Sequence, residues 1–140
     1  MAILLNGTQK VLVHGGTGAY SRPLLAVMRQ TGTRLVGAVS IGRGGEVLEG
    51  LPVFDTVSEA VAATAADTAV LYIPAPGVKD GLVELADAGI ALAMVAAEGV
   101  PLHDALFALA YARRKGLWVI GPNCMGIMSP GKAMLGALGK

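Results

Sequence analysis

The stretch "VLVHGGTGAYSRPLL", from Val11 to Leu25, joins a short apolar run to a helical pattern through a glycine-rich turn. Glycine lets backbone N–H groups approach an anion closely, because no Cβ stands in the way. A strand, a glycine loop and a helix in this order are typical of phosphate-binding turns in α/β proteins. A tight turn that binds nothing has the same composition, so the interpretation depends on the rest of the chain.

The rest of the chain repeats the alternation of strand-like and helix-like segments. Six continuous runs rich in Val, Ile and Leu favour strands covered on both faces, at residues 10–14, 34–39, 51–54, 68–74, 92–97 and 117–121. Helical patterns lie at residues 21–31, 56–64, 76–88 and 101–115. This order predicts a single α/β domain with a Rossmann-like, doubly wound parallel sheet over residues 1–121.

Local signals add detail to three of these segments. Thr56 and Glu59 form a capping-box pattern, "TVSE", at the start of the second helix. In the last helix, Leu102, Leu106, Leu109 and Ala110 form the apolar face, and "ARRKG" places cations in the final turn, where they suit the helix dipole. Met28 and Met94 are expected to fill the core.

Residues 122–140 read as a loop-like tail without a clear final element. We expect this tail to complete a binding site and to lead toward a further domain. The apolar stretch from Met125 to Leu138 suggests a contact with another domain or chain.

Composition excludes several classes of function. The net charge of +1 and the lack of a basic stripe argue against nucleic-acid binding. No run reaches the roughly 18–20 apolar residues that cross a bilayer, and the opening "MAILLNGTQK" does not fit a signal peptide. A single cysteine forms no internal disulfide, which favours the reducing cytoplasm. No metal-ligand spacing and no triphosphate-binding loop is present.

Glycine, proline and polar residues follow the predicted strands at one edge of the sheet, at residues 15–21, 40–45, 74–76, 98–99 and 121–124. Because ligands bind at this edge in doubly wound folds, five such loops imply a groove. The first loop breaks the dinucleotide fingerprint, since Ser21 stands where the third glycine belongs. The second strand ends without the carboxylate of an NAD site, and Arg43 follows among glycines. A guanidinium there suits a phosphorylated ribose, as in NADP or coenzyme A, although a solvated surface arginine is the alternative.

Several longer motifs resemble one family. They are "GGTGAYS", "GRGG" followed by "GLPVFDTVSEAV", "YIPAPGVKD", "AEGVP" and "GPNCMGIMSPGKAMLG". In order and spacing they resemble the α subunit of succinyl-CoA synthetase and related nucleotide-forming acyl-CoA ligases, from near residue 3 to the last residue. The resemblance implies the family's N-terminal CoA-binding domain, with coenzyme A as its ligand.

The resemblance also assigns binding residues. It implies that Thr17, Gly18, Ala19 and Tyr20, with Ser21 closing the loop, lie against the CoA phosphates, and that Arg43 takes the place of a lysine that meets the nucleotide end. Ser40 and Pro74 would line the adenine and pantetheine path, and Ala96, Ala97 and Glu98 would contact the cofactor. Asn123 and Cys124 would lie near the thiol.

Departures from the family pattern occur at Ser21, Ile41, Ala97 and Met125. In the family, a C-terminal domain carries a phosphorylated histidine, and a β subunit binds the nucleotide. This chain stops where that domain would begin, so we expect a ligase domain and a β-type nucleotide-binding subunit as partners. No catalytic residue is assigned to the chain itself, which does not look like a complete enzyme.

The two histidines and the one cysteine are the remaining side chains that could take part in catalysis, and the sequence favours structural roles for them. His14 is expected to be a satisfied histidine rather than a phosphoryl carrier, and His103 a surface residue. Cys124 is either a small packed residue or, if a helix starts there, an activated thiol. Two other functions remain open: a free-standing CoA sensor or carrier, and an NAD(P)-dependent oxidoreductase or redox sensor.

Overall fold

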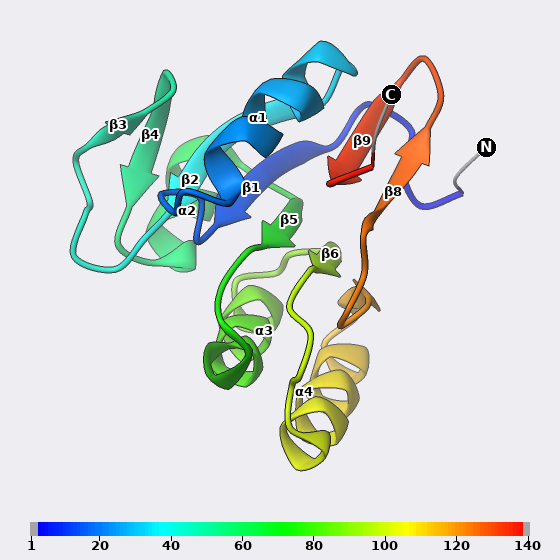
Figure 1. Cartoon of the computed structure of the whole chain (residues 1–140). Coiled ribbons are helices and arrows are strands. Elements are labelled where there is room, and N and C mark those ends of the chain that lie inside the picture. The colour runs from blue at the N-terminus through cyan, green and yellow to red at the C-terminus, as the bar shows by residue number, and fades with distance from the viewer. Residues whose placement is uncertain (1–2, 139–140) are drawn as a thin grey trace.

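The computed structural model describes residues 3–138, which form a seven-stranded sheet with helices on both faces (Figure 1). The strands are β1 (Lys10–His14), β2 (Arg34–Val39), β3 (Val47–Leu48), β4 (Leu51–Phe54), β5 (Thr68–Leu71), β6 (Leu92–Val95) and β7 (Trp118–Ile120). Their order is β3-β4-β2-β1-β5-β6-β7, and every neighbouring pair is parallel except β3 with β4. The predicted doubly wound α/β fold is confirmed.

The helices divide between the two faces of the sheet. Helix α1 (Ser21–Gln30) covers one face, and α2 (Val57–Thr64), α3 (Val78–Asp87) and α4 (Leu102–Arg114) cover the other. The chain crosses between faces after β4, so the sheet extends in opposite directions on either side of β1. This reversal of strand order lies between β1 and β5, where doubly wound folds bind their ligands.

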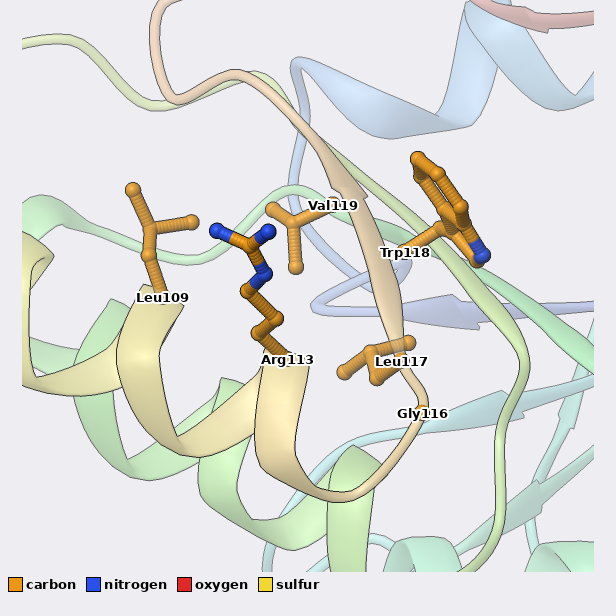
Figure 2. A pocket seen from close by; sticks show the side chains of 6 residues that line it. All are labelled: Leu109, Arg113, Gly116, Leu117, Trp118 and Val119. Carbon is orange, nitrogen blue, oxygen red and sulfur yellow. The ribbon is translucent and has the colours of Figure 1, made fainter.

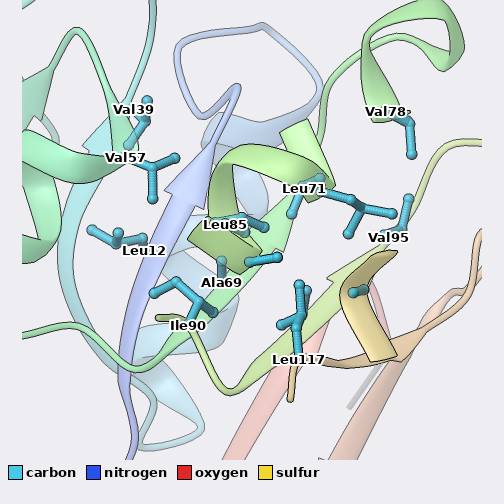
Figure 3. Close-up of a cluster of buried hydrophobic side chains, with 14 of the residues drawn as sticks. Leu12, Val39, Val57, Ala69, Leu71, Val78, Leu85, Ile90, Val95 and Leu117 are labelled. Carbon is cyan, nitrogen blue, oxygen red and sulfur yellow. The ribbon is translucent and has the colours of Figure 1, made fainter. Parts of the chain in front are cut away.

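Two apolar clusters, one on each face, hold these layers together. Side chains on β1 alternate between them: Leu12 joins the cluster beneath α2, α3 and α4, and Val11 and Val13 join the cluster beneath α1. Figure 3 shows the first cluster, where Leu71, Leu85 and other aliphatic side chains meet between sheet and helices. Met28 and Met94 are fully buried in the second cluster, as predicted.

The tail expected to be loop-like forms a hairpin instead. Strands β8 (Gly126–Ser129) and β9 (Ala133–Gly136) pair antiparallel, and β9 packs beside α1 on the same face of the sheet (Figure 1). Ala133, Met134 and Leu135 are buried there. The expectation of a loop was wrong because glycine and proline around residues 126–131 hid a turn between two short strands. Part of the apolar tail therefore packs on its own domain.

The orientation of α4 also differs from the prediction. Ala108 and Ala112 face the core, and Leu102 and Leu106 point to solvent. A leucine periodicity, at positions 102, 106 and 109, and an alanine periodicity run along the same helix, and the smaller side chains pack against the sheet. Small residues allow the helix to approach the neighbouring elements closely, which explains why they take the inner face.

Helix boundaries otherwise follow the sequence signals. The Thr56 hydroxyl accepts a hydrogen bond of 3.2 Å from the Glu59 amide and caps α2. The segment predicted as one helix at 76–88 begins with a short 3₁₀ turn at Ala75–Gly77 and continues as α3. Among residues 3–138, no helix is both long enough and apolar enough to span a lipid bilayer.

Candidate functional site

The loops after β1, β2, β5, β6 and β7 all lie at the carboxyl edge of the sheet, because these strands run parallel. Strands β5, β6 and β7 are shorter than predicted, so residues 72–74, 96–97 and 121 belong to loops rather than to strands. This edge is the one where the sequence predicted a groove. It brings together segments that are more than a hundred residues apart in the chain.

The glycine loop between β1 and α1 is braced from within by Ser21. The Ser21 side chain is buried, and its Oγ lies 3.1 Å from the carbonyl oxygen of Gly15 and 3.0 Å from that of Gly18. In the described part of the chain, the amide N–H groups of residues 16–21 donate no hydrogen bond. These free N–H groups, at the positive end of the α1 dipole, form a cradle suited to an anion.

Two glycines of this loop have different roles. Gly15 has a φ of +81°, and a Cβ built on it would lie 2.8 Å from the carbonyl oxygen of Tyr72, so the position requires glycine. A Cβ built on Gly18 would have open space around it, because the nearest atom to that Cβ would be the Ser21 Oγ at 3.7 Å. Gly15 therefore serves the fold, and Gly18 leaves the outer rim of the loop bare.

The loop after β2 lies next to the glycine loop. The hydroxyls of Thr17 and Ser40 are 3.1 Å apart and link the two loops directly. The Arg43 guanidinium contacts Glu46 instead of standing free: its Nε is 3.0 Å and its Nη2 2.7 Å from Glu46 Oε2. Glu46 also raises the pKa of Arg43 through this hydrogen bond. Both side chains are exposed, so an incoming phosphate can compete for the guanidinium.

A pocket of about 540 Å³ opens at the ends of β5 and β6. It is lined by Tyr20, Tyr72, Ile73, Pro74, Ala75, Ala96, Ala97, Glu98, Asn123 and Met125. Six of these residues were predicted site residues; Tyr72, Ile73, Ala75 and Met125 were missed. The sequence pattern predicts Tyr72 and Ile73 as strand residues because they continue an apolar run, although their place beside Pro74 is also typical of a pocket wall.

Two tyrosines form one side of this pocket. Their rings meet edge to face with centroids 6.0 Å apart, and Tyr20 is exposed. The Tyr72 hydroxyl is buried and has no hydrogen-bond partner among the described residues. Burial raises the pKa of Tyr72 far above its ordinary value, so the phenol is neutral and available as a donor.

The turn after β7 is tied to the end of β6. The Asn123 amide donates to the Ala97 carbonyl at 2.8 Å, and the Cys124 amide donates to the Val95 carbonyl at 3.2 Å. Asn123 has a φ of +55°, a conformation that asparagine tolerates well. Cys124 does not line the pocket: its Sγ accepts a hydrogen bond of 3.3 Å from the Gly126 amide and packs against the second apolar cluster. No helix starts at Cys124, so the structure offers no dipole to activate the thiol.

Neither histidine enters the pocket. His14 points toward α3, where its Nε2 lies 3.5 Å from Glu84 Oε2, and burial lowers its pKa below the ordinary value of 6.5. His103 is exposed on α4. Within residues 3–138, no group of three or more His, Cys, Asp or Glu side chains could hold a metal ion. Glu98 is thus the one charged side chain that lines the described pocket.

Most of the loops at the carboxyl edge of the sheet fall within a segment that matches a known protein family. The family model described as "CoA binding domain" matches residues 6–99, which include the glycine loop, the Arg43 loop and the ends of β5 and β6. The chain belongs to the CoA-binding domain family. The predicted family resemblance and the prediction of coenzyme A as ligand are confirmed.

Curated relatives of this CoA-binding domain extend the match over nearly the whole chain. The sequence is 41% identical to the succinate–CoA ligase [ADP-forming] subunit alpha 2 of Archaeoglobus fulgidus over 138 residues, 99% of this chain and 48% of the relative. It is also 41% identical to the malate–CoA ligase subunit alpha of Methylorubrum extorquens, over 142 residues, 99% of this chain and 48% of the relative. The chain therefore spans about half the length of the curated relatives it matches.

A solved structure agrees at the level of fold. The ATP citrate lyase of Methanothrix soehngenii, solved with citrate and coenzyme A, superposes with a TM-score of 0.84 and 23% identity, over 96% of this chain and 24% of the other. The residues of this CoA-binding domain fit the coenzyme chemically. Free N–H groups at a helix N-terminus suit phosphates, and the largely apolar pocket beside them suits a slender, mostly apolar arm with amide groups. Such an arrangement can bind a ligand and orient it.

Proposed function

We propose that this chain is the CoA-binding part of an acid–CoA ligase, and that it holds CoA with the thiol directed toward an acyl group activated elsewhere. The observation that carries this proposal is the free amide cradle at the start of α1, in a chain that is 41% identical over nearly its whole length to two acid–CoA ligase α subunits. The acid itself is not defined by this chain. Activation of the acid belongs to a ligase domain and a β-type nucleotide-binding subunit, in a reducing, cytoplasmic setting.

The binding roles follow the order of the loops along the edge. Residues 17–21 hold the phosphates through their amides, and Ser40 and Arg43 receive the nucleotide end. Pro74, Ala96, Ala97 and Glu98 flank the pantetheine arm in the pocket at the ends of β5 and β6. Asn123 lines the end of this pocket nearest to β7. Cys124 lies outside the pocket and stabilises the turn after β7 through the hydrogen bond between its Sγ and the Gly126 amide. Tyr72 adds a neutral donor that lacks a partner within the described residues.

Calorimetric titration of the chain with CoA, dephospho-CoA and NADPH tests the proposal directly. We expect CoA to bind and dephospho-CoA, which lacks the 3′-phosphate, to bind more weakly because Arg43 loses its partner. The Arg43→Gln variant should bind CoA and dephospho-CoA with equal affinity. The Arg34→Gln variant, changed at the amino end of β2 and away from the loops, should keep the difference in affinity between the two ligands. Tight binding of NADPH without binding of CoA would overturn the proposal.

The ligase role needs a second experiment, because CoA binding alone also fits a free-standing carrier. Affinity purification of the tagged chain from its own cells should recover a polypeptide that carries the nucleotide-binding and phosphohistidine functions. The recovered complex should form acyl-CoA from an acid, CoA and a nucleoside triphosphate. A chain that binds CoA and is recovered alone is a carrier or sensor rather than a ligase part.

A further inference from the structure

An unusual apolar surface lies at the β7 edge of the domain, away from the CoA pocket. Leu102, Leu106 and Leu109 follow one another along α4 at a spacing of about one helical turn, on the side that does not face the core. Leu102 is 70% exposed and Leu106 58% exposed. Trp118, on β7, is 66% exposed. Large exposed apolar side chains on both sides of the β7 edge indicate an interaction surface.

This surface contains a groove between α4 and β7 of about 430 Å³. Leu109, Arg113, Gly116, Leu117, Trp118 and Val119 line it. Figure 2 shows the Arg113 side chain between Leu109 and Val119, with Trp118 on the opposite side of β7. A segment lying along β7 would therefore contact the helix on one face of the sheet and the indole on the other.

The backbone of β7 is open to a further strand. β7 is the last strand in the sheet order, and the Trp118 amide donates to the Ala91 carbonyl just before β6 at 2.9 Å. In a parallel ladder, alternate residues bond to the same neighbour, so the N–H and C=O of Val119 point away from β6. An open edge of this kind pairs readily with an extended segment of another polypeptide.

The charge of the groove defines what its occupant must carry. No carboxylate among residues 3–138 lies within 4.0 Å of the Arg113 guanidinium, whereas the nearby Lys115 is paired with Asp87 at 3.1 Å. Arg113 therefore brings an uncompensated positive charge into an apolar groove. A carboxylate on the occupant would form a charge-assisted, bidentate contact there, which a second cation would not.

We propose that the α4–β7 groove binds an extended segment of a partner protein that pairs with β7, places an aliphatic or aromatic side chain beside Leu109 or Trp118, and directs a carboxylate to Arg113. This surface is separate from the residues that line the CoA pocket, so the inference does not depend on the ligase role. The one tryptophan of the chain lies in the groove and reports on its occupancy.

A phage-displayed library of random peptides, selected on the immobilised chain, provides the probe. We expect enriched sequences in which Asp or Glu follows or precedes large apolar residues. The corresponding synthetic peptides should shift the emission of Trp118 to shorter wavelength as the indole becomes buried. Arg113→Gln should weaken their binding at least about tenfold, because a charge-assisted contact is lost. Arg114→Gln is the matched control, since Arg114 is the next residue of the same helix turn and does not line the groove.

Circular dichroism and CoA titration show that each variant is folded, so a loss of peptide binding is not a loss of structure. Three results would overturn the proposal. The first is a lack of acidic, apolar peptides among those enriched. The second is equal binding of such peptides by the Arg113→Gln and Arg114→Gln variants, or binding that leaves Trp118 emission unchanged. The third is self-association in sedimentation velocity that is abolished by Trp118→Ser, which would make a second copy of this chain the occupant.

Discussion

His14 on β1 and Glu84 on α3 form a contact that joins three elements. His14 Nε2 lies 3.5 Å from one carboxylate oxygen of Glu84, and the other oxygen accepts a hydrogen bond of 2.7 Å from the Val57 amide at the start of α2. Burial lowers the pKa of His14, and the nearby Glu84 carboxylate opposes this shift only in part. His14 therefore stays neutral in the folded protein at pH values where it would already be protonated in the unfolded chain.

The free energy of unfolding should consequently fall as the pH drops below 6.5. Above that pH, His14 is neutral in both states. As the pH falls toward the lower pKa of the folded state, the unfolded chain takes up the proton first, and folding becomes less favourable by about 1.4 kcal/mol for each unit between the two pKa values. Urea titrations between pH 8 and pH 5 should show this loss, and His14→Gln should reduce it.

His103→Gln serves as the control for that experiment, because it removes the exposed histidine and keeps the buried one. The His103 variant should lose stability on acidification as the parent chain does. If His14→Gln retains the full dependence on pH and His103→Gln loses it, the assignment to the buried site is wrong.

The Arg43–Glu46 ion pair predicts that removal of the Glu46 charge tightens the binding of CoA. A phosphate that binds Arg43 must displace the Glu46 carboxylate, which contacts both Nε and Nη2. Because the pair is exposed and weak, Glu46→Gln should tighten CoA binding modestly, by about two- to fivefold. Dephospho-CoA, without the 3′-phosphate, should gain less. Calorimetry measures both, and Glu49→Gln, three residues further along, is the control; an equal gain for both ligands would mean that Arg43 does not meet the 3′-phosphate.

Gly15 and Gly18 of the first loop should respond differently to substitution by alanine. Gly15→Ala introduces a Cβ at a positive φ, 2.8 Å from a backbone oxygen, so we expect a loss of more than about 1 kcal/mol of stability. Gly18→Ala meets no close neighbour and should change stability by less than about 0.5 kcal/mol. Its methyl group nevertheless narrows the amide cradle, so CoA affinity should fall. Urea denaturation and calorimetry on the same samples separate the effect on stability from the effect on binding. Unchanged CoA affinity in the Gly18→Ala variant would mean that the CoA phosphates do not bind at this loop.

The sequence predicted six of the seven strands of the sheet, the helices and the edge that carries the loops, because hydrophobic periodicity and glycine positions encode them locally; it did not predict the two-residue strand β3. It did not predict which face of α4 is buried. Leucine and alanine periodicities coexist there, and the choice between them depends on how closely α4 must pack. Nor did it predict the contact of Arg43 with Glu46, since a side-chain pair across a turn has no signature in composition. Tyr72 was missed for a similar reason: an apolar residue after β5 reads as strand until the strand's end is known.

Thr33 provides a last test, of the hairpin that the sequence did not indicate. Its Oγ1 donates to the Met134 carbonyl at 2.6 Å and accepts from the Met134 amide at 3.0 Å, so one hydroxyl satisfies both backbone groups of a fully buried residue on β9. Thr33→Val keeps the shape and removes both bonds, leaving the two groups buried without partners. We expect a loss of about 1–3 kcal/mol and faster hydrogen exchange at the Met134 amide. Thr33→Ser keeps the hydroxyl and should lose no more than about 1 kcal/mol with the missing methyl group. Equal stability of the valine and serine variants would show that this contact does not hold β9 in place.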